Sequence, residues 1–313
     1  MKRSLLRSGA VLGLLVLFTA SLTAQDQKKY TFKWKVPSVG ETMGMQMKMT
    51  MDNETTVKMD GEVMQSMSMK MKNSEKREIE VLATDGKSIT KLKIKYLEMS
   101  NEMDAGEMEG MPGMPEVGEN LAELVGNTYI VELVDGAPKV TDEAGEAVAD
   151  SVAETVKAQE VKDGRFTTWS PILEKIIPDR PISVGETFTI KGEDAKDLVP
   201  MGGPIDGEGG LEDLSVEVTF SGTKKILGTE CGVFDIKINI GSSPVPGVEL
   251  KGAPTGQIVV GVDNMWLYQM KLNGDMTMNG TPDMGDQPAP VDISIDATIK
   301  IRADGLALYG KKK

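Results

Sequence analysis

Apolar and polar residues alternate along several long stretches of this chain. Side chains alternate across a β-strand, so each run places its apolar residues on one face and Lys, Thr, Asp or Ser on the other. The pattern predicts a mainly β fold of half-buried antiparallel strands, some about eleven residues or 36 Å long, as in a large curved sheet or half-barrel. The clearest runs are Tyr30, Phe32, Trp34 and Val36; Met43, Met45, Met47, Met49 and Met51; Trp266, Tyr268, Met270, Leu272, Met276 and Met278; and Val291, Ile293, Ile295, Ala297, Ile299 and Ile301.

The interval from Thr141 to about Val161 departs from this alternation, because Val recurs every four residues among Ala, Glu and Asp. That spacing predicts one amphipathic helix, with an N-cap at Thr141 or Asp142. A second, shorter helix is expected from Ile172 to Ile177, before Pro178. Two segments rich in Gly and acidic residues predict loops, Asn101 to Glu119 and Pro200 to Asp213.

The pentapeptide Ser-Val-Gly-Glu-Thr occurs twice, at residues 38–42 and 183–187. At the same offset, residues 81–85 are similar to residues 226–230, and after a slip of one residue Leu92-Lys93-Ile94 matches Ile236-Lys237-Ile238. These collinear matches predict two related β-rich halves joined by the helical segment. The alternative is a favourable turn-to-strand sequence that arose twice, with Gly40 and Gly185 in tight turns. The expected organisation is an N-terminal β half at 25–140, a helical connector at 141–180 and a C-terminal β half at 181–313.

The stretch Pro-Ile-Ser-Val-Gly-Glu-Thr-Phe at residues 181–188 follows a predicted helix and precedes alternating strands. In this it resembles a family of exported bacterial β-rich proteins of unknown function, although Phe188 stands where we expect Trp. The resemblance implies export and a β-rich architecture, and it implies no activity. At the level of architecture alone, long one-sided strands with a helix also resemble the periplasmic lipoprotein carriers, whose open half-barrels hold acyl chains.

The N-terminus has the layout of a secretory signal peptide. Lys2, Arg3 and Arg7 precede an apolar run from residue 10 to residue 20, and small residues follow up to Ala24. We expect a signal peptide at residues 1–24 with cleavage near Ala24, and a periplasmic or secreted protein. The apolar run is too short to span a bilayer, so an uncleaved anchor is the weaker alternative and no transmembrane segment is expected after cleavage.

The composition of the 313 residues excludes much familiar chemistry. The chain has no His and one Cys, so Ser-His-Asp and Cys-His catalysis and His-ligated or Cys-ligated zinc sites are ruled out. The formal net charge of −13 disfavours binding to nucleic acid. We therefore expect no enzyme, but a binding or structural protein of the cell envelope, with an envelope protein as a candidate partner.

Methionine is unusually abundant, with 22 residues. Met is flexible and fills irregular gaps, so one interpretation of its alternation is a Met-packed core. The other is an apolar face left partly open, which would hold a lipid or another hydrophobic ligand. The candidate ligand-binding residues are Met43, Met45, Met47, Met49, Met51, Met67, Met69 and Met71, and Met276 and Met278 are candidates to join them.

A third interpretation of the methionines is a soft-metal site. Met108, Met111 and Met114 form a Met-x-x-Met-x-x-Met motif, and thioethers bind Cu(I) or Ag(I) without deprotonation. The alternatives there are an acidic loop without order, or loose Ca(II) binding by Asp104, Glu107 and Glu109. We expect no cofactor, with Cu(I) as the alternative.

Cys231, the single cysteine, follows a predicted turn. It is interpreted as a small buried residue, with pairing between chains as the alternative.

Overall fold

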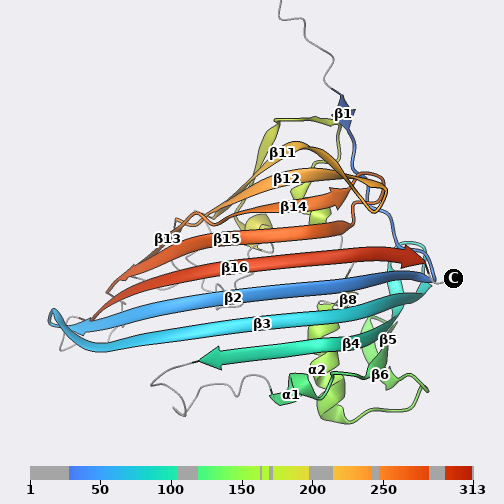
Figure 1. Cartoon of the computed structure of the whole chain (residues 1–313), viewed down its shortest axis with the longest axis horizontal. Coiled ribbons are helices and arrows are strands. Elements are labelled where there is room, and N and C mark those ends of the chain that lie inside the picture. The colour runs from blue at the N-terminus through green and yellow to red at the C-terminus, as the bar shows by residue number, and fades with distance from the viewer. Residues whose placement is uncertain are drawn as a thin grey trace, which may run out of the picture.

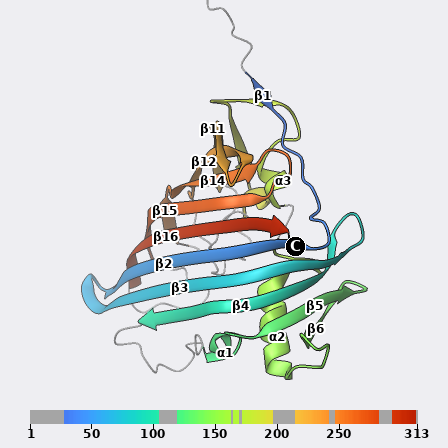
Figure 2. The same cartoon turned by 45° about the vertical axis from the view of Figure 1, so that its right-hand side comes forward.

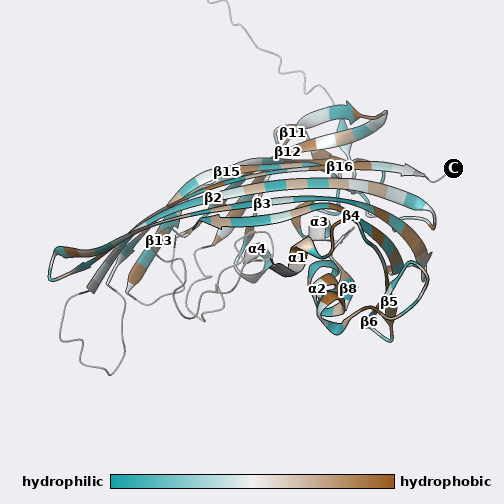
Figure 3. Ribbon diagram, turned by 60° about the horizontal axis from the view of Figure 1, so that its bottom comes forward, coloured by the Kyte–Doolittle hydropathy of each residue, from teal (hydrophilic) through white to brown (hydrophobic). Residues whose placement is uncertain are grey.

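A single antiparallel sheet of 12 strands forms the body of this protein in the computed structural model (Figure 1). The structure describes residues 28–104, 119–162, 164–168, 172–196, 214–241, 247–281 and 293–311. The sheet is arched, and the helices lie on its concave side, as the hydropathy-coloured ribbon in Figure 3 shows. The predicted mainly β fold, with long antiparallel strands in an open curved sheet, is confirmed.

The order of the strands places both predicted halves in the same sheet. β16 lies between β15 and β2, so a strand from the end of the described chain pairs with one near its beginning. Two short ribbons stand apart, β1 (Lys29–Tyr30) with β9 (Ile182–Ser183) and β7 (Val161–Lys162) with β8 (Arg165–Phe166). In order across the sheet, the strands are β10 (Thr187–Lys191), β11 (Ser215–Ile226), β12 (Thr229–Asn239), β14 (Thr255–Gly261), β15 (Leu267–Gly280), β16 (Ile293–Lys311), β2 (Glu41–Met59), β3 (Glu62–Thr84), β4 (Ile89–Asp104), β5 (Thr128–Val134) and β6 (Ala137–Asp142), with β13 (Val248–Gly252) beside β15.

The central strands are longer than the alternation predicts. β2 and β16 have 19 residues each and β3 has 23. At about 3.3 Å per residue, a strand of 19 residues extends roughly 60 Å. Met59 to Glu62 form a two-residue hairpin in which Asp60 and Gly61 have φ of 51° and 81°, so the strands continue directly into one another. The same pair of positive φ angles closes the hairpins at Asp135-Gly136 and Leu227-Gly228.

Both copies of the pentapeptide form the same turn. Gly40 and Gly185 have φ of 82° and 86°, which confirms their predicted position in tight turns at the start of a strand. The Ser38 N–H donates to Oε2 of Glu41 at 2.6 Å, and in the second copy the Ser183 N–H donates to Oε2 of Glu186 at 3.0 Å. β2 begins within the first copy, at Glu41, and β10 begins at Thr187, the last residue of the second copy.

The second similar pair of segments does not occupy matching positions. Residues 81–84 end strand β3, whereas Leu227 and Gly228 form the turn between β11 and β12. The third pair of segments does occupy matching positions. Leu92–Ile94 lie on β4, the third of the strands β2, β3 and β4, and Ile236–Ile238 lie on β12, the third of the strands β10, β11 and β12. The duplication stays a prediction.

The amphipathic helix begins later than its sequence pattern suggests. β6 runs to Asp142, whose Oδ1 accepts a hydrogen bond of 2.8 Å from the Glu146 N–H in the turn that follows. The predicted N-cap at Thr141 or Asp142 is therefore wrong, because both residues belong to a strand. The short helix before Pro178 is confirmed. The helices are α1 (Glu119–Ala122), α2 (Asp150–Glu160), α3 (Ile172–Ile176) and α4 (Glu193–Lys196).

Two further expectations about elements are corrected. The strand predicted over Tyr30–Val36 is limited to Lys29–Tyr30, and Phe32 is buried because its ring packs edge-on against Phe220 and Phe234. The loop predicted from Asn101 begins later, since β4 continues to Asp104. Residues 105–118, the loop predicted at 200–213 and the predicted signal peptide at 1–24 lie outside the described residues.

Two groups of buried apolar residues hold the helices to the sheet. One joins α3, through Leu173 and Ile176, to the C-terminal strands, and the other joins α2, through Val156, to β3, β4 and β5. Figure 2 shows α2 beside β4, β5 and β6, near one edge of the sheet, whereas α3 lies near β14 and β15, towards the other edge. Cys231 is fully buried in the second group, as predicted for a small core residue, and burial raises the pKa of its thiol.

Candidate functional site

The eight methionines predicted on neighbouring strands lie on one face of β2 and β3. The two strands pair with Met51 directly opposite Met71, and opposite residues of an antiparallel pair point to the same side of the sheet. Met43 is buried at 4% exposure, whereas the other seven are half-buried. The methionine face consists of Met43, Met45, Met47, Met49, Met51, Met67, Met69 and Met71. Its placement on paired strands is confirmed, and its role in binding stays a prediction.

Small residues of β16 lie next to one end of the methionine face. Gly305 is directly opposite Met47, and Ala307 is opposite Met45. On the other side of β16, Met270 of β15 is opposite Gly305, and a Cβ added to Gly305 would meet the Met270 Cβ at 3.6 Å. An added carbon would thus make only an ordinary van der Waals contact. The missing side chain of Gly305 therefore leaves a depression in the sheet surface.

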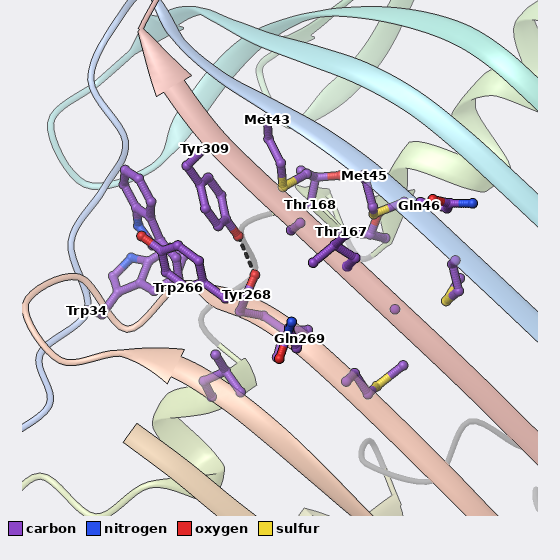
Figure 4. Close-up of a pocket in the computed structure, with 17 residues that line it drawn as sticks. Trp34, Met43, Met45, Gln46, Thr167, Thr168, Trp266, Tyr268, Gln269 and Tyr309 are labelled. Atoms are coloured by element: carbon purple, nitrogen blue, oxygen red, sulfur yellow. Dashed lines mark hydrogen bonds between the residues drawn. The ribbon is translucent and has the colours of Figure 1, made fainter. Parts of the chain in front are cut away.

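A cavity of about 170 Å³ lies over this depression, between the sheet and the segment that precedes α3 (Figure 4). Its walls are mostly apolar, with four aromatic side chains at one end and methionines at the other. The lining residues are Trp34, Met43, Met45, Gln46, Met47, Thr167, Thr168, Leu173, Trp266, Leu267, Tyr268, Gln269, Met270, Gly305, Leu306, Ala307 and Tyr309.

The polar atoms of two of these aromatic residues are satisfied by the backbone. The Tyr309 hydroxyl donates a hydrogen bond of 2.6 Å to the Leu267 carbonyl, and Trp266 Nε1 donates one of 2.7 Å to the Lys35 carbonyl. The Tyr309 ring packs against Trp266 and Tyr268 with centroid distances of 4.9 and 4.8 Å. Burial raises the pKa of Tyr309, so its hydroxyl stays protonated. These side chains therefore present apolar rings to the cavity.

Trp34 and Thr168 also line a second cavity of about 440 Å³, so both cavities border these two side chains. Thr168 is 6% exposed, and its Oγ1 has no hydrogen-bond partner among the described residues. A buried hydroxyl without a partner is unfavourable, and a ligand or water at this position would satisfy it. The second cavity is more polar than the first, because it is also lined by Asp85, Lys87, Ser88 and Arg165.

A buried ionic cluster adjoins the methionine face on β3. Arg77 forms an ion pair with Glu160, the last residue of α2, and its Nη2 lies 3.7 Å from the Met45 sulfur. Arg77 Nε also lies 2.6 Å from Oε1 of Glu75, although these two atoms lack hydrogen-bond geometry. Burial raises the pKa of Glu75; Arg77 opposes this and Glu160 reinforces it. The cluster joins α2 to the sheet beside the cavity.

The predicted metal motif, Met108, Met111 and Met114, lies outside the described residues, as do Glu107 and Glu109. Among the residues that are described, no three His, Cys, Asp or Glu side chains gather as a metal site. No described helix is both long and apolar enough to cross a membrane.

The aromatic part of the cavity is not apparent from the sequence. Trp266 and Tyr268 were recognised only as apolar members of a strand, and Trp34 only as part of another predicted strand, whereas Tyr309 and Thr168 were not singled out. Tyr268 and Tyr309 come together with the methionines through the pairing of β15 with β16 and of β16 with β2, and the second of these pairings joins residues more than 200 positions apart. Trp34, Thr168 and Trp266 lie outside these strands. The one signal for the aromatic part in the sequence is that Trp266 and Tyr268 lie two positions apart in a chain with only 4% aromatic residues.

Comparisons with known proteins add little to this picture. Neither a protein-family model nor a curated protein matches the sequence, so the resemblance to exported bacterial β-rich proteins stays a prediction. Seventeen chains of solved structures match, among them one described as "lipid-protein interactions in lipovitellin", with 7% identity and a TM-score of 0.40 over 88% of this chain. The match covers 26% of the lipovitellin chain, so this protein spans about a quarter of its length. At these values, the likeness carries no argument about function.

Proposed function

We propose that this protein is an exported, non-enzymatic binding protein that holds the apolar part of a lipid-like ligand against the methionine face. The observation that carries the proposal is the cavity beside Gly305, which is walled by aromatic rings and by Met43, Met45 and Met47. Apolar cavities with a few polar groups are the usual form of sites for small hydrophobic molecules.

The exposure of the methionines supports binding more than a closed core. Met43 is buried, whereas Met45, Met47, Met49 and Met51 are half-buried. Met45, Met49 and Met51 pack against the two buried groups of the core, so each of them is covered only in part. Methionine adapts its shape to different partners because its side chain is unbranched and flexible. The partly covered row therefore offers a slender apolar chain further contacts beyond the cavity along β2.

The size of the cavity sets the scale of the interaction. A dry cavity of about 150 Å³ holds a molecule the size of benzene. A longer chain would have to continue along the methionine face, and each buried methylene group contributes about 0.8 kcal/mol. Ten such groups would contribute roughly 8 kcal/mol, which corresponds to a micromolar affinity before the cost of association.

The second cavity suggests an anionic head for this ligand. Lys87 and Arg165 line it, and neither forms an ion pair with another described residue. Asp85 is also present, but its carboxylate already accepts hydrogen bonds from the backbone N–H groups of Lys87 and Ser88 at 2.8 and 2.7 Å, which lower its pKa. A carboxylate near Thr168 would accept a hydrogen bond from its unpartnered hydroxyl and face both cations.

The test measures binding of dodecanoic acid by quenching or shift of tryptophan fluorescence, because Trp34 and Trp266 line the cavity. Gly305→Val fills the depression and should weaken binding about tenfold or more, since roughly two methylene groups lose their place. Gly44→Val is the matched control, because Gly44 lies on the neighbouring strand among residues of the opposite face, with nothing within 4 Å of an added Cβ.

Dodecanol tests the anionic head. Arg165→Gln should weaken binding of dodecanoic acid and leave that of dodecanol unchanged. Equal affinity of the wild type and Gly305→Val for dodecanoic acid would overturn the cavity as the binding site. Absence of binding to either probe by the wild type would overturn the proposed function.

A further inference from the structure

The register of β2, β3 and β4 places three methionines side by side. Met51 is directly opposite Met71, and Met71 is directly opposite Met103. Residues opposite one another on adjacent antiparallel strands have Cβ atoms about 4.5–5.5 Å apart and project to the same face. All three side chains are half-buried. The three thioethers therefore form a row across three strands, with Met71 at its centre.

We propose that Met51, Met71 and Met103 form a binding site for a soft monovalent cation, Cu(I) or Ag(I). Thioether sulfur is a soft ligand that favours these ions and needs no deprotonation. Long, flexible methionine side chains can converge on one ion from this spacing, and three sulfurs supply a complete trigonal set. The chain offers no histidine as a competing ligand, and its one cysteine is buried.

The surroundings of the row favour a cation. Asn101 and Asn73 form the neighbouring opposed pair on the same face of β4 and β3. Oδ1 of Asn101 is buried and has no hydrogen-bond partner among the described residues. A buried carbonyl oxygen without a hydrogen-bond donor is unfavourable because its partial negative charge is not balanced. A positive ion close to Met103 would balance the partial charge of Asn101 Oδ1.

This site lies beyond the cavity but shares the methionine face, because Met51 and Met71 belong to both. The cavity contacts Met43, Met45 and Met47, whereas Met51 lies four residues farther along β2, about 13 Å from Met47. It is also distinct from the Met-x-x-Met-x-x-Met motif of the sequence. Binding at the cavity and binding at the row can therefore be tested by separate variants, Gly305→Val and Met71→Leu.

The test is titration of the full mature chain with Ag(I) in chloride-free buffer, followed by isothermal calorimetry and by NMR of ¹³C-labelled methionine methyl groups. The resonances of Met51, Met71 and Met103 should shift together with the first equivalent of Ag(I). Met71→Leu should lower the affinity about tenfold or more, because it removes the central sulfur of three. Leucine fills a similar volume, so the sheet should keep its packing.

Two variants make the result specific. Met59→Leu is the matched control, because Met59 is a half-buried residue of β2 on the same face but outside the row. The Met59→Leu variant should bind Ag(I) with the affinity of the wild type. The triple variant Met108→Leu, Met111→Leu and Met114→Leu should also keep the affinity. Loss of binding in this triple variant with wild-type affinity in Met71→Leu would overturn the proposal. So would a wild-type spectrum in which the three methyl resonances do not move, a result that needs no variant to fold.

Discussion

The hydroxyl of Tyr96 donates a hydrogen bond of 2.6 Å to Oε1 of Glu160. Tyr96 lies on β4 and Glu160 ends α2, so this bond, together with the ion pair between Arg77 and Glu160, fixes the helix against the sheet. Both Tyr96 and Glu160 are fully buried. Burial and the adjacent carboxylate raise the pKa of Tyr96, which keeps the donor protonated.

Replacing Tyr96 with Phe should destabilise the protein by about 1.5–3 kcal/mol, since a buried charged acceptor loses one donor. Tyr309→Phe is the comparison, because it removes a hydrogen bond to the neutral Leu267 carbonyl and should cost about 0.5–1.5 kcal/mol. The free energy of unfolding in urea measures both. A smaller cost for Tyr96→Phe than for Tyr309→Phe would contradict the role assigned to Glu160.

Glu75 gives the stability a measurable pH dependence. Its pKa is raised above the ordinary 4.5, mainly by burial, so the folded state binds the proton more tightly than the unfolded state. Protonation of Glu75 therefore favours folding, and its contribution to stability rises as the pH falls from 7 towards 4.5. Glu75→Gln should remove this contribution and should be more stable than the wild type at pH 7.

The measurement for Glu75 is the difference between the two curves of unfolding free energy against pH. The difference cancels the opposite effect of groups such as Glu186, whose pKa is lowered by its hydrogen bond from the Ser183 backbone and by Arg180. If the difference in unfolding free energy between the two proteins stayed constant from pH 7 to pH 4.5, burial would not raise the pKa of Glu75.

The repeated turn makes a paired prediction. Gly40→Ala and Gly185→Ala should each cost about 1–2 kcal/mol, because both positions have a left-handed φ that an L-residue avoids. Gly44→Ala is the control, since its φ is not positive and an added Cβ meets nothing within 4 Å, so it should be neutral or slightly stabilising. Thermal unfolding measures all three, and clearly unequal losses at the two turns would contradict their structural equivalence.

Oxidation of the methionines should follow their exposure. Thioethers react with peroxide where it can reach them. Met64, which is 58% exposed, should form its sulfoxide fastest, Met45 and Met47 at intermediate rates, and Met43 and Met265 slowest. Peptide mass spectrometry over a time course measures the order. Dodecanoic acid should protect Met45 and Met47 while leaving Met64 unchanged, and equal protection of all three would contradict binding at the cavity.

The alternation of the sequence predicts the β class of the fold and the shared face of the methionines, because that pattern is local, but it does not give the lengths of the central strands. The start of α2 was misplaced because Thr141 and Asp142, good helix caps by type, belong to a strand that pairs with β5. Phe32 lies in an extended segment that forms no strand, since its burial comes from Phe220 and Phe234. The cavity and the row of Met51, Met71 and Met103 depend on register, which no single stretch of sequence contains.

The central position of β16 has a consequence for how the molecule is assembled. Residues 293–311 pair on one side with residues 41–59 and on the other with β15. Until β16 is synthesised, β2 and β15 each expose a long unpaired edge, which is a template for association with other chains. Pairing across so many intervening residues is also slow. The two parts of the sheet therefore become continuous only when β16 has paired with both β2 and β15.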